Sequence, residues 1–137
     1  MRIVLDTNIL VSGLLNPNGA PGRVVDLILG RRLFLLYDDR RLGEYEDVLA
    51  RPQLEIPQDR AAAVISFLRL TGDRIIALPL PAKLLPDPDD LPFVEVAISG
   101  KAEALITGNL KHFLGLDKYE IKILSSAKLI EQLQSTT

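Results

Sequence analysis

Short apolar runs alternate with longer stretches of helical periodicity along most of the chain. The runs predict buried strands over residues 2–5, 33–37, 74–78, 104–106 and 121–124. Helical patterns lie between them, over residues 7–15, 24–29, 39–50, 57–71, 93–99 and from about 125 to 133. Strands that alternate with helices in this way predict an α/β protein, a three-layer α/β/α arrangement with a central parallel sheet of four to five strands.

Proline and glycine mark the ends of these elements. The run 16–19, together with Pro21 and Gly22, is expected to end the first helix and to delay the second until Val24. A proline-rich connection over residues 79–92 is short enough to be a loop, and the chain has no internal repeat or low-complexity tract. A single domain over residues 1–137 is therefore expected.

Composition narrows the function classes without choosing one. The chain has no cysteine, which excludes disulfides, thiolate zinc sites and cysteine nucleophiles. No apolar run reaches the roughly 18 residues of a membrane span, and the apolar start is too short for a signal peptide, so a cytoplasmic protein is expected. The net charge of −2 argues mildly against a nucleic-acid binder. A metallonuclease is the exception, because its acidic site counts against net charge until cations fill it.

Acidic residues fall where the elements of such a sheet begin and end. Asp6 ends the first strand, Glu44 lies in the helix after the second, and an acidic run precedes the helix of Phe93. Residues 107–109 follow the fourth strand. Since ligands of parallel sheets bind beyond the carboxyl ends of the strands, these groups are expected to converge at one edge. The pattern leaves open which of Asp87, Asp89 and Asp90 takes part.

Carboxylates gathered without basic partners repel one another unless a cation neutralises them. Their hard oxygen atoms favour Mg²⁺ or Mn²⁺, and such ions activate water for phosphodiester hydrolysis. Each acid taken alone also has a structural interpretation: Asp6 as a helix cap, Glu44 as a solvated surface residue, and the acidic run as a turn with an N-cap. Their coincidence at one sheet edge favours the metal site.

Four segments in order resemble the PIN-domain family, in the branch that contains toxins of bacterial and archaeal toxin–antitoxin modules (VapC-like). They are residues 1–12 (MRIVLDTNILVS), 42–52 (LGEYEDVLARP), 87–93 (DPDDLPF) and 106–113 (ITGNLKHF). The resemblance spans nearly the whole chain. It implies an Mg²⁺- or Mn²⁺-dependent ribonuclease that cleaves RNA, is commonly a homodimer, and is often held inactive by a small antitoxin protein.

Carried over by position, the resemblance implies Asp6, Glu44 and Asp90 as catalytic metal ligands, with Asp87 as a nearby second acid. The register of the helix from Phe93 favours Asp90 over Asp89. Many members have an aspartate where this chain has Asn109, so a weaker second metal site, or a single ion, is expected. Further residues are expected to position ligands, waters or phosphate oxygens: Thr7, Asn8, Ser12, Thr107, Asn109 and His112.

Other functions are weaker or compete directly. A phosphatase that forms an aspartyl-phosphate needs a second acid two residues after Asp6, where this chain has Asn8. No Gly-x-Gly-x-x-Gly follows the first strand, and no Walker motif is present. The main alternative is a PIN-fold module that binds RNA or protein with weak or no catalysis. Its candidate basic contacts, none with an individual role, are Arg40, Arg41, Arg51, Lys101, Lys111 and Lys118.

Overall fold

The computed structural model describes residues 1–135, and within these residues five strands form one sheet in the order β3-β2-β1-β4-β5. Every neighbouring pair is parallel. The strands are β1 (Arg2–Leu5), β2 (Phe34–Tyr37), β3 (Asp73–Arg74), β4 (Ala104–Ile106) and β5 (Lys122–Leu124). In the central strand β1, Ile3, Val4 and Leu5 are fully buried.

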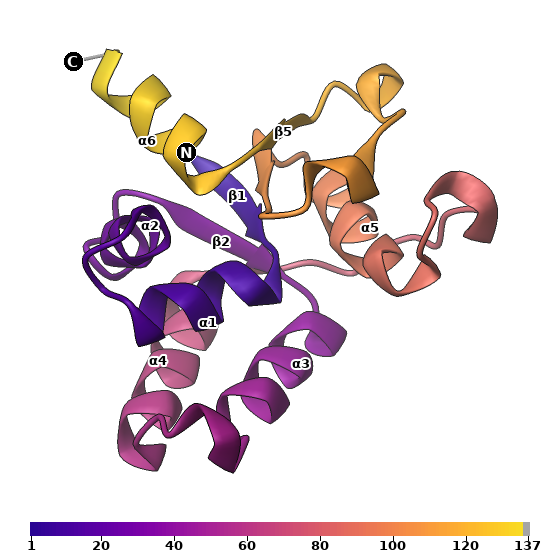
Figure 1. Ribbon diagram of the computed structural model, residues 1–137. Coiled ribbons are helices and arrows are strands. Elements are labelled where there is room, and N and C mark those ends of the chain that lie inside the picture. The colour runs from indigo at the N-terminus through magenta and orange to yellow at the C-terminus, as the bar shows by residue number, and fades with distance from the viewer. Residues whose placement is uncertain (136–137) are drawn as a thin grey trace.

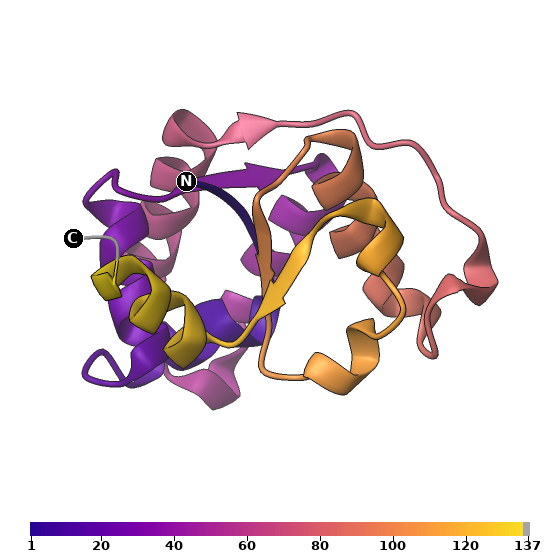
Figure 2. The same cartoon turned by 90° about the horizontal axis from the view of Figure 1, so that it is seen from above.

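Helices cover both faces of the sheet (Figure 1). They are α1 (Thr7–Leu15), α2 (Ala20–Leu29), α3 (Asp39–Leu49), α4 (Gln58–Thr71), α5 (Leu91–Ser99) and α6 (Ser126–Ser135). In Figure 2, α5 and α6 lie on opposite sides of β4 and β5. Helix α5 contacts β1, β2 and β4, whereas α2 packs against α1 and α6. The predicted α/β/α arrangement with a parallel sheet is confirmed.

None of the helices within residues 1–135 combines the length and the apolar character that a membrane crossing needs.

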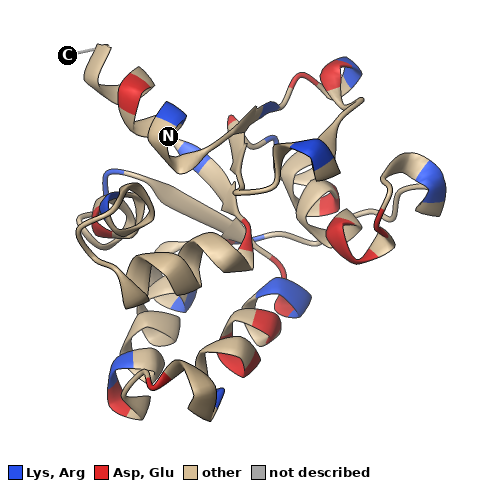
Figure 3. Ribbon diagram, in the orientation of Figure 1, with Lys and Arg blue, Asp and Glu red and all other residues tan. Residues whose placement is uncertain are grey.

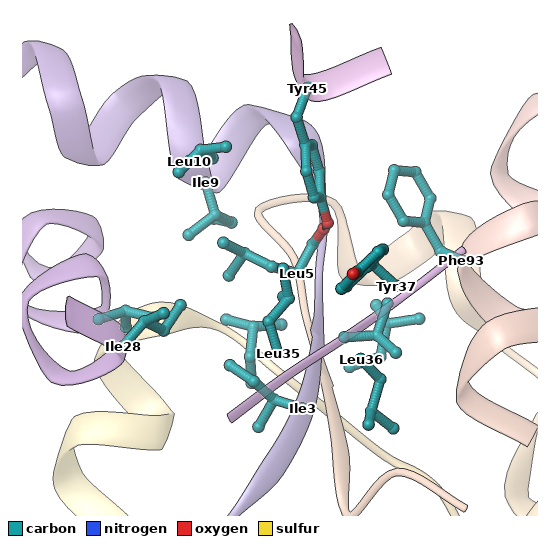
Figure 4. Packing of buried hydrophobic residues seen from close by; sticks show 14 of the residues in the cluster. Ile3, Leu5, Ile9, Leu10, Ile28, Leu35, Leu36, Tyr37, Tyr45 and Phe93 are labelled. Atoms are coloured by element: carbon teal, nitrogen blue, oxygen red, sulfur yellow. The ribbon is translucent and has the colours of Figure 1, made fainter. Parts of the chain in front are cut away.

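The core reaches directly to the end of β1. Tyr45 of α3 is fully buried, and its hydroxyl donates a hydrogen bond to the Leu5 carbonyl oxygen. Figure 4 shows this hydroxyl pointing at Leu5 among the apolar side chains. Burial raises the pKa of Tyr45 far above its usual range; Arg41 opposes the shift, and the charges of Asp6, Glu44 and Asp38 add to it. The phenol therefore stays protonated and fixes α3 beside the residue that precedes Asp6.

Not every predicted element bound is confirmed: helix α5, for example, begins at Leu91 rather than Phe93, with Pro92 in its first turn. Helix α2 begins at Ala20 rather than Val24, because proline is tolerated in a first helical turn, where its missing N–H has no partner anyway.

The strand predicted over residues 74–78 is paired only at Asp73 and Arg74. Its neighbour β2 ends at Tyr37, so Ile75 makes the last backbone bond to that strand. The Leu78 and Leu80 N–H groups beyond it bond instead to the Ser99 and Glu95 side chains of α5.

Gly22 allows the close approach of α2 to the loop before it. A Cβ atom at this position would lie 2.2 Å from the Pro17 carbonyl oxygen, whereas one at Gly43 of α3 would meet nothing within 4 Å. We expect Gly22→Ala to destabilise the protein by about 2–3 kcal/mol. Gly43→Ala should instead stabilise it by about 0.5–1 kcal/mol. Urea unfolding of both variants measures the difference, and similar effects at the two glycines would contradict this account of the packing.

Candidate functional site

Polar side chains follow β1, β2 and β4 at the carboxyl end of the sheet. They are Asp6, Asp38 and Thr107, and all three are buried. Figure 3 shows acidic segments (red) where β1 ends, along α3 and just before α5. The parallel register places the three strand ends at one edge, so the convergence expected from the sequence is present in the fold.

Asp6 is held in a fixed orientation by its neighbours. Its Oδ2 accepts a 2.8 Å hydrogen bond from the Thr107 hydroxyl, and its Oδ1 accepts one from the Asn8 backbone N–H at 3.3 Å. Asp6 therefore fills both of the roles considered for it: its side chain caps the N-terminus of α1, and it also lies at the candidate site. The Thr107 hydroxyl also accepts from the Asn109 backbone N–H. This chain of bonds ties the ends of β1 and β4 together.

Asp90 contributes the second acid of the edge. Its Oδ2 is buried and has no hydrogen-bond donor among the residues described. His112 Nδ1 lies 3.2 Å away, close enough for an ion pair when the imidazole is charged, but not in hydrogen-bond geometry. Burial raises the pKa of Asp90, the charges of Asp87 and Asp6 raise it further, and His112 opposes them. The carboxylates therefore crowd one another, and a cation would relieve that repulsion.

Glu44 is engaged differently. Its Oε2 accepts hydrogen bonds from the Thr7 hydroxyl and, at 2.9 Å, from Arg41 Nη1. Thr7 directly follows Asp6, so Glu44 is tied to the acidic edge through its neighbour in sequence. Its own charge is paired with a cation of the same helix.

The remaining predicted residues lie around this edge with fewer contacts. Asp87 is exposed and caps the 3₁₀ turn Pro88–Asp90 by accepting from the Asp89 backbone N–H. Asn8, Asn109 and His112 are exposed beside the buried residues. Ser12 is exposed two turns into α1, and within residues 1–135 its side chain makes no hydrogen bond to the site.

Sequence reasoning gave no individual role to Arg40 and Arg41 and did not single out Glu95, although all three shape the site. Arg41 is buried, pairs with Glu44 and stacks on Phe93. Arg40 bridges two buried carboxylates, Asp38 and Glu95. A signal did exist for Glu95, because it is the one charged residue in the otherwise apolar stretch 91–99. A lone acid on an apolar helix indicates a partner from elsewhere in the fold.

The donors suit a hard divalent cation, although the acids are not drawn together around one. Within residues 1–135, no group of three or more histidine, aspartate or glutamate side chains is arranged to hold a metal ion. Mg²⁺ is typically bound through one or two carboxylates and keeps several waters. Asp6 and Asp90 are two such carboxylates at this edge, and Asp90 Oδ2 is buried without a hydrogen bond.

Comparisons with known proteins bear on the family and the fold of this chain. A family model described as "PIN domain" matches residues 2–111. An uncharacterized protein of Methanocaldococcus jannaschii is 26% identical over 144 residues, which cover 98% of this chain and 92% of that protein. The crystal structure of VapBC2 from Rickettsia felis, bound to a DNA fragment from their promoter, covers 91% of this chain and 98% of that chain. Its TM-score of 0.54 at 15% identity shows a shared fold.

Proposed function

Because its match to the family model spans residues 2–111, the chain belongs to the PIN-domain family, and we propose that it is an Mg²⁺- or Mn²⁺-dependent ribonuclease. One observation carries the proposal: the Asp90 carboxylate oxygen Oδ2 is buried with only His112 Nδ1 beside it, at 3.2 Å, and the charges of Asp6 and Asp87 act on the same carboxyl group. This cluster has the charge and the oxygen donors that a divalent ion selects.

In the proposed site, Asp6 and Asp90 hold the ion, and Asp87 adds negative charge beside it. Thr107 orients Asp6 through its hydroxyl, and the Asn8 N–H fixes the other Asp6 oxygen. A bound Mg²⁺ or Mn²⁺ supplies a Lewis acid that polarises a phosphoryl oxygen and activates water. Asn8, Asn109 and His112 are exposed at the same edge, where they can contact the RNA backbone. Glu44, a predicted ligand, is paired with Arg41 in this structure.

The partners and setting follow from the same proposal. The VapBC2 structure is that of a complex from a toxin–antitoxin pair, which favours a small antitoxin as partner of this chain also. RNA as substrate and a homodimeric assembly stay predictions of the family resemblance. A single domain over residues 1–137 and a cytoplasmic location stay predictions from length and composition.

A second candidate is an RNA- or protein-binding module with weak or no catalysis. Two observations favour it: position 109 carries a neutral amide, and the Glu44 charge is already compensated by Arg41. This alternative predicts RNA binding that does not depend on a divalent ion.

Cleavage of a mixed panel of single-stranded and structured RNAs separates the two candidates. The protein is first treated with EDTA and desalted, then assayed with Mg²⁺, Mn²⁺, Ca²⁺ or no added ion. We expect cleavage only with Mg²⁺ or Mn²⁺. RNA binding without cleavage under every condition would contradict the ribonuclease and support the binding module.

Asn109→Asp tests whether the missing charge limits metal binding. Asn109 is exposed at the end of β4, and its backbone N–H is fixed by the Thr107 hydroxyl. A carboxylate there adds one negative charge and two oxygen donors to the edge. We expect Mn²⁺ affinity to rise about threefold or more and the cleavage rate to rise with it. Calorimetric titration measures the affinity, and an unchanged affinity would show that position 109 lies outside the metal's surroundings.

A further inference from the structure

Helix α3 carries a buried cation within the acidic edge. We propose that Arg41 is a built-in counter-ion that competes with the divalent metal for Glu44, an inference that rests on the metal site proposed above. Glu44 is then withheld from the metal while Arg41 is paired with it, and Arg41 sets how tightly the ion binds.

Arg41 is held in place at three points. The Asp38 side chain accepts from its backbone N–H at 2.9 Å, which fixes the first turn of α3. Its guanidinium carbon lies 4.6 Å from the centre of the Phe93 ring on α5. Its Nη1 donates to Glu44 Oε2 at 2.9 Å. The side chain is about nine-tenths buried, so this cation cannot simply turn into solvent.

The pair is nevertheless incomplete, which makes it replaceable. Only Nη1 binds Glu44, and Arg41 Nε is buried without an acceptor within the part of the chain described. A parallel two-bond arrangement, the strongest form of an arginine–carboxylate pair, is therefore not formed. The Glu44 side chain is 41% exposed, and both of its donors meet at the same oxygen, Oε2. In the proposed competition, Glu44 leaves Arg41 and turns toward an ion beside Asp6.

A metal ion that recruits Glu44 must first break this pair. The break leaves the Arg41 guanidinium against Phe93 without a carboxylate, which is costly for a buried charge unless another anion replaces it. A phosphate oxygen of the RNA is the anion that the proposed substrate would supply. A packing role alone, in which Arg41 only joins α3 to α5 through Phe93, makes no such prediction for metal affinity.

Mn²⁺ titrations of four proteins form a double-mutant cycle that tests the competition: wild type, Arg41→Gln, Glu44→Gln and the double variant. We expect Arg41→Gln to tighten Mn²⁺ binding about fivefold, the upper range for a partly exposed ion pair. Glu44→Gln should weaken binding by about twofold or less in wild type, and by about tenfold when Arg41 is absent. Arg74→Gln removes the same charge from an exposed pair and should leave the affinity unchanged.

Two results would overturn the competition: an equal effect of Glu44→Gln in both backgrounds, or no tightening in Arg41→Gln. The first result would mean that Arg41 affects metal binding only through its charge. The second, together with a lowered melting temperature, would mean that Arg41 only packs α3 against α5. Arg41→Met, whose side chain still covers Phe93, repeats the measurement if the glutamine variant does not fold. If neither wild type nor any variant bound Mn²⁺, the proposed metal site itself would be refuted, which is distinct from a failure of the competition. If only Arg41→Gln bound Mn²⁺, the competition would be supported.

Discussion

Asp6→Asn is expected to lower metal-dependent RNA cleavage by about a thousandfold while the protein stays folded. The asparagine oxygen can still accept from the Thr107 hydroxyl, or from the Asn8 N–H that caps α1. The change therefore removes the negative charge that neutralises a divalent ion and keeps the shape of the side chain. Cleavage of the RNA panel under saturating Mn²⁺ measures the loss, and calorimetry should show Mn²⁺ affinity falling at least about tenfold.

Asp39→Asn is the matched control for this change. Asp39 starts α3, is exposed and pairs with Arg74, whose hydrogen bond outweighs the small effect of burial and lowers the pKa of Asp39. It carries the same charge as Asp6, but its carboxylate pairs with Arg74 rather than with a residue of the acidic edge. Its replacement should therefore leave both cleavage and metal affinity unchanged. Mn²⁺-dependent cleavage by purified Asp6→Asn at the wild-type rate would sink the proposed mechanism.

Some elements could be located from the sequence because nearby residues alone determine their apolar pattern and their ends. The strands over 2–5 and 104–106 and the helix over 7–15 match the structure. The two strands are apolar runs, and the helix lies between Asp6 and the turn residues 16–19. The strand predicted after Arg74 failed for a non-local reason: residues 75–78 are apolar, but β2 has no further residues to pair with them. Strand length depends on a partner that lies over thirty residues away in sequence, which no local pattern contains.

The candidate site, like the fold, was predictable in part from the sequence. Parallel topology was enough to predict that Asp6 and the acidic run before Phe93 meet at one edge, because topology fixes which strand ends are neighbours. Which charges are paired was not predictable. Glu44 and Arg41 lie on a helix rich in charged residues, so the sequence pattern favours solvent exposure for both. Arg41 is nevertheless buried, because it packs against Phe93 of α5, which is distant in sequence.

Loss of Arg40 is expected to lower the stability of the folded protein. Its guanidinium donates to Asp38 at 2.6 Å and to Glu95 at 2.8 Å, and both carboxylates are buried. The other Glu95 oxygen accepts from the Leu80 backbone N–H, so the same acid fixes the proline-rich connection onto α5. Burial disfavours the charged form of Arg40, but the hydrogen bonds that it donates to Glu95 and Asp38 outweigh this effect and raise its pKa.

Arg40→Met should therefore destabilise the protein by about 2–3 kcal/mol, because it leaves two buried carboxylates without a counter-ion. The expectation is below the usual cost of breaking a buried pair, since Arg40 is 48% exposed and water can reach the vacated position. Thermal melts should show a decrease of roughly 6–12 °C. Arg74→Met breaks an ion pair that is exposed on both sides and should not measurably change the melting temperature. Adding Glu95→Gln to Arg40→Met removes one unpaired charge and should recover part of the loss; a double variant no more stable than Arg40→Met would show that packing of the arginine stem, rather than charge, stabilises this part of the fold.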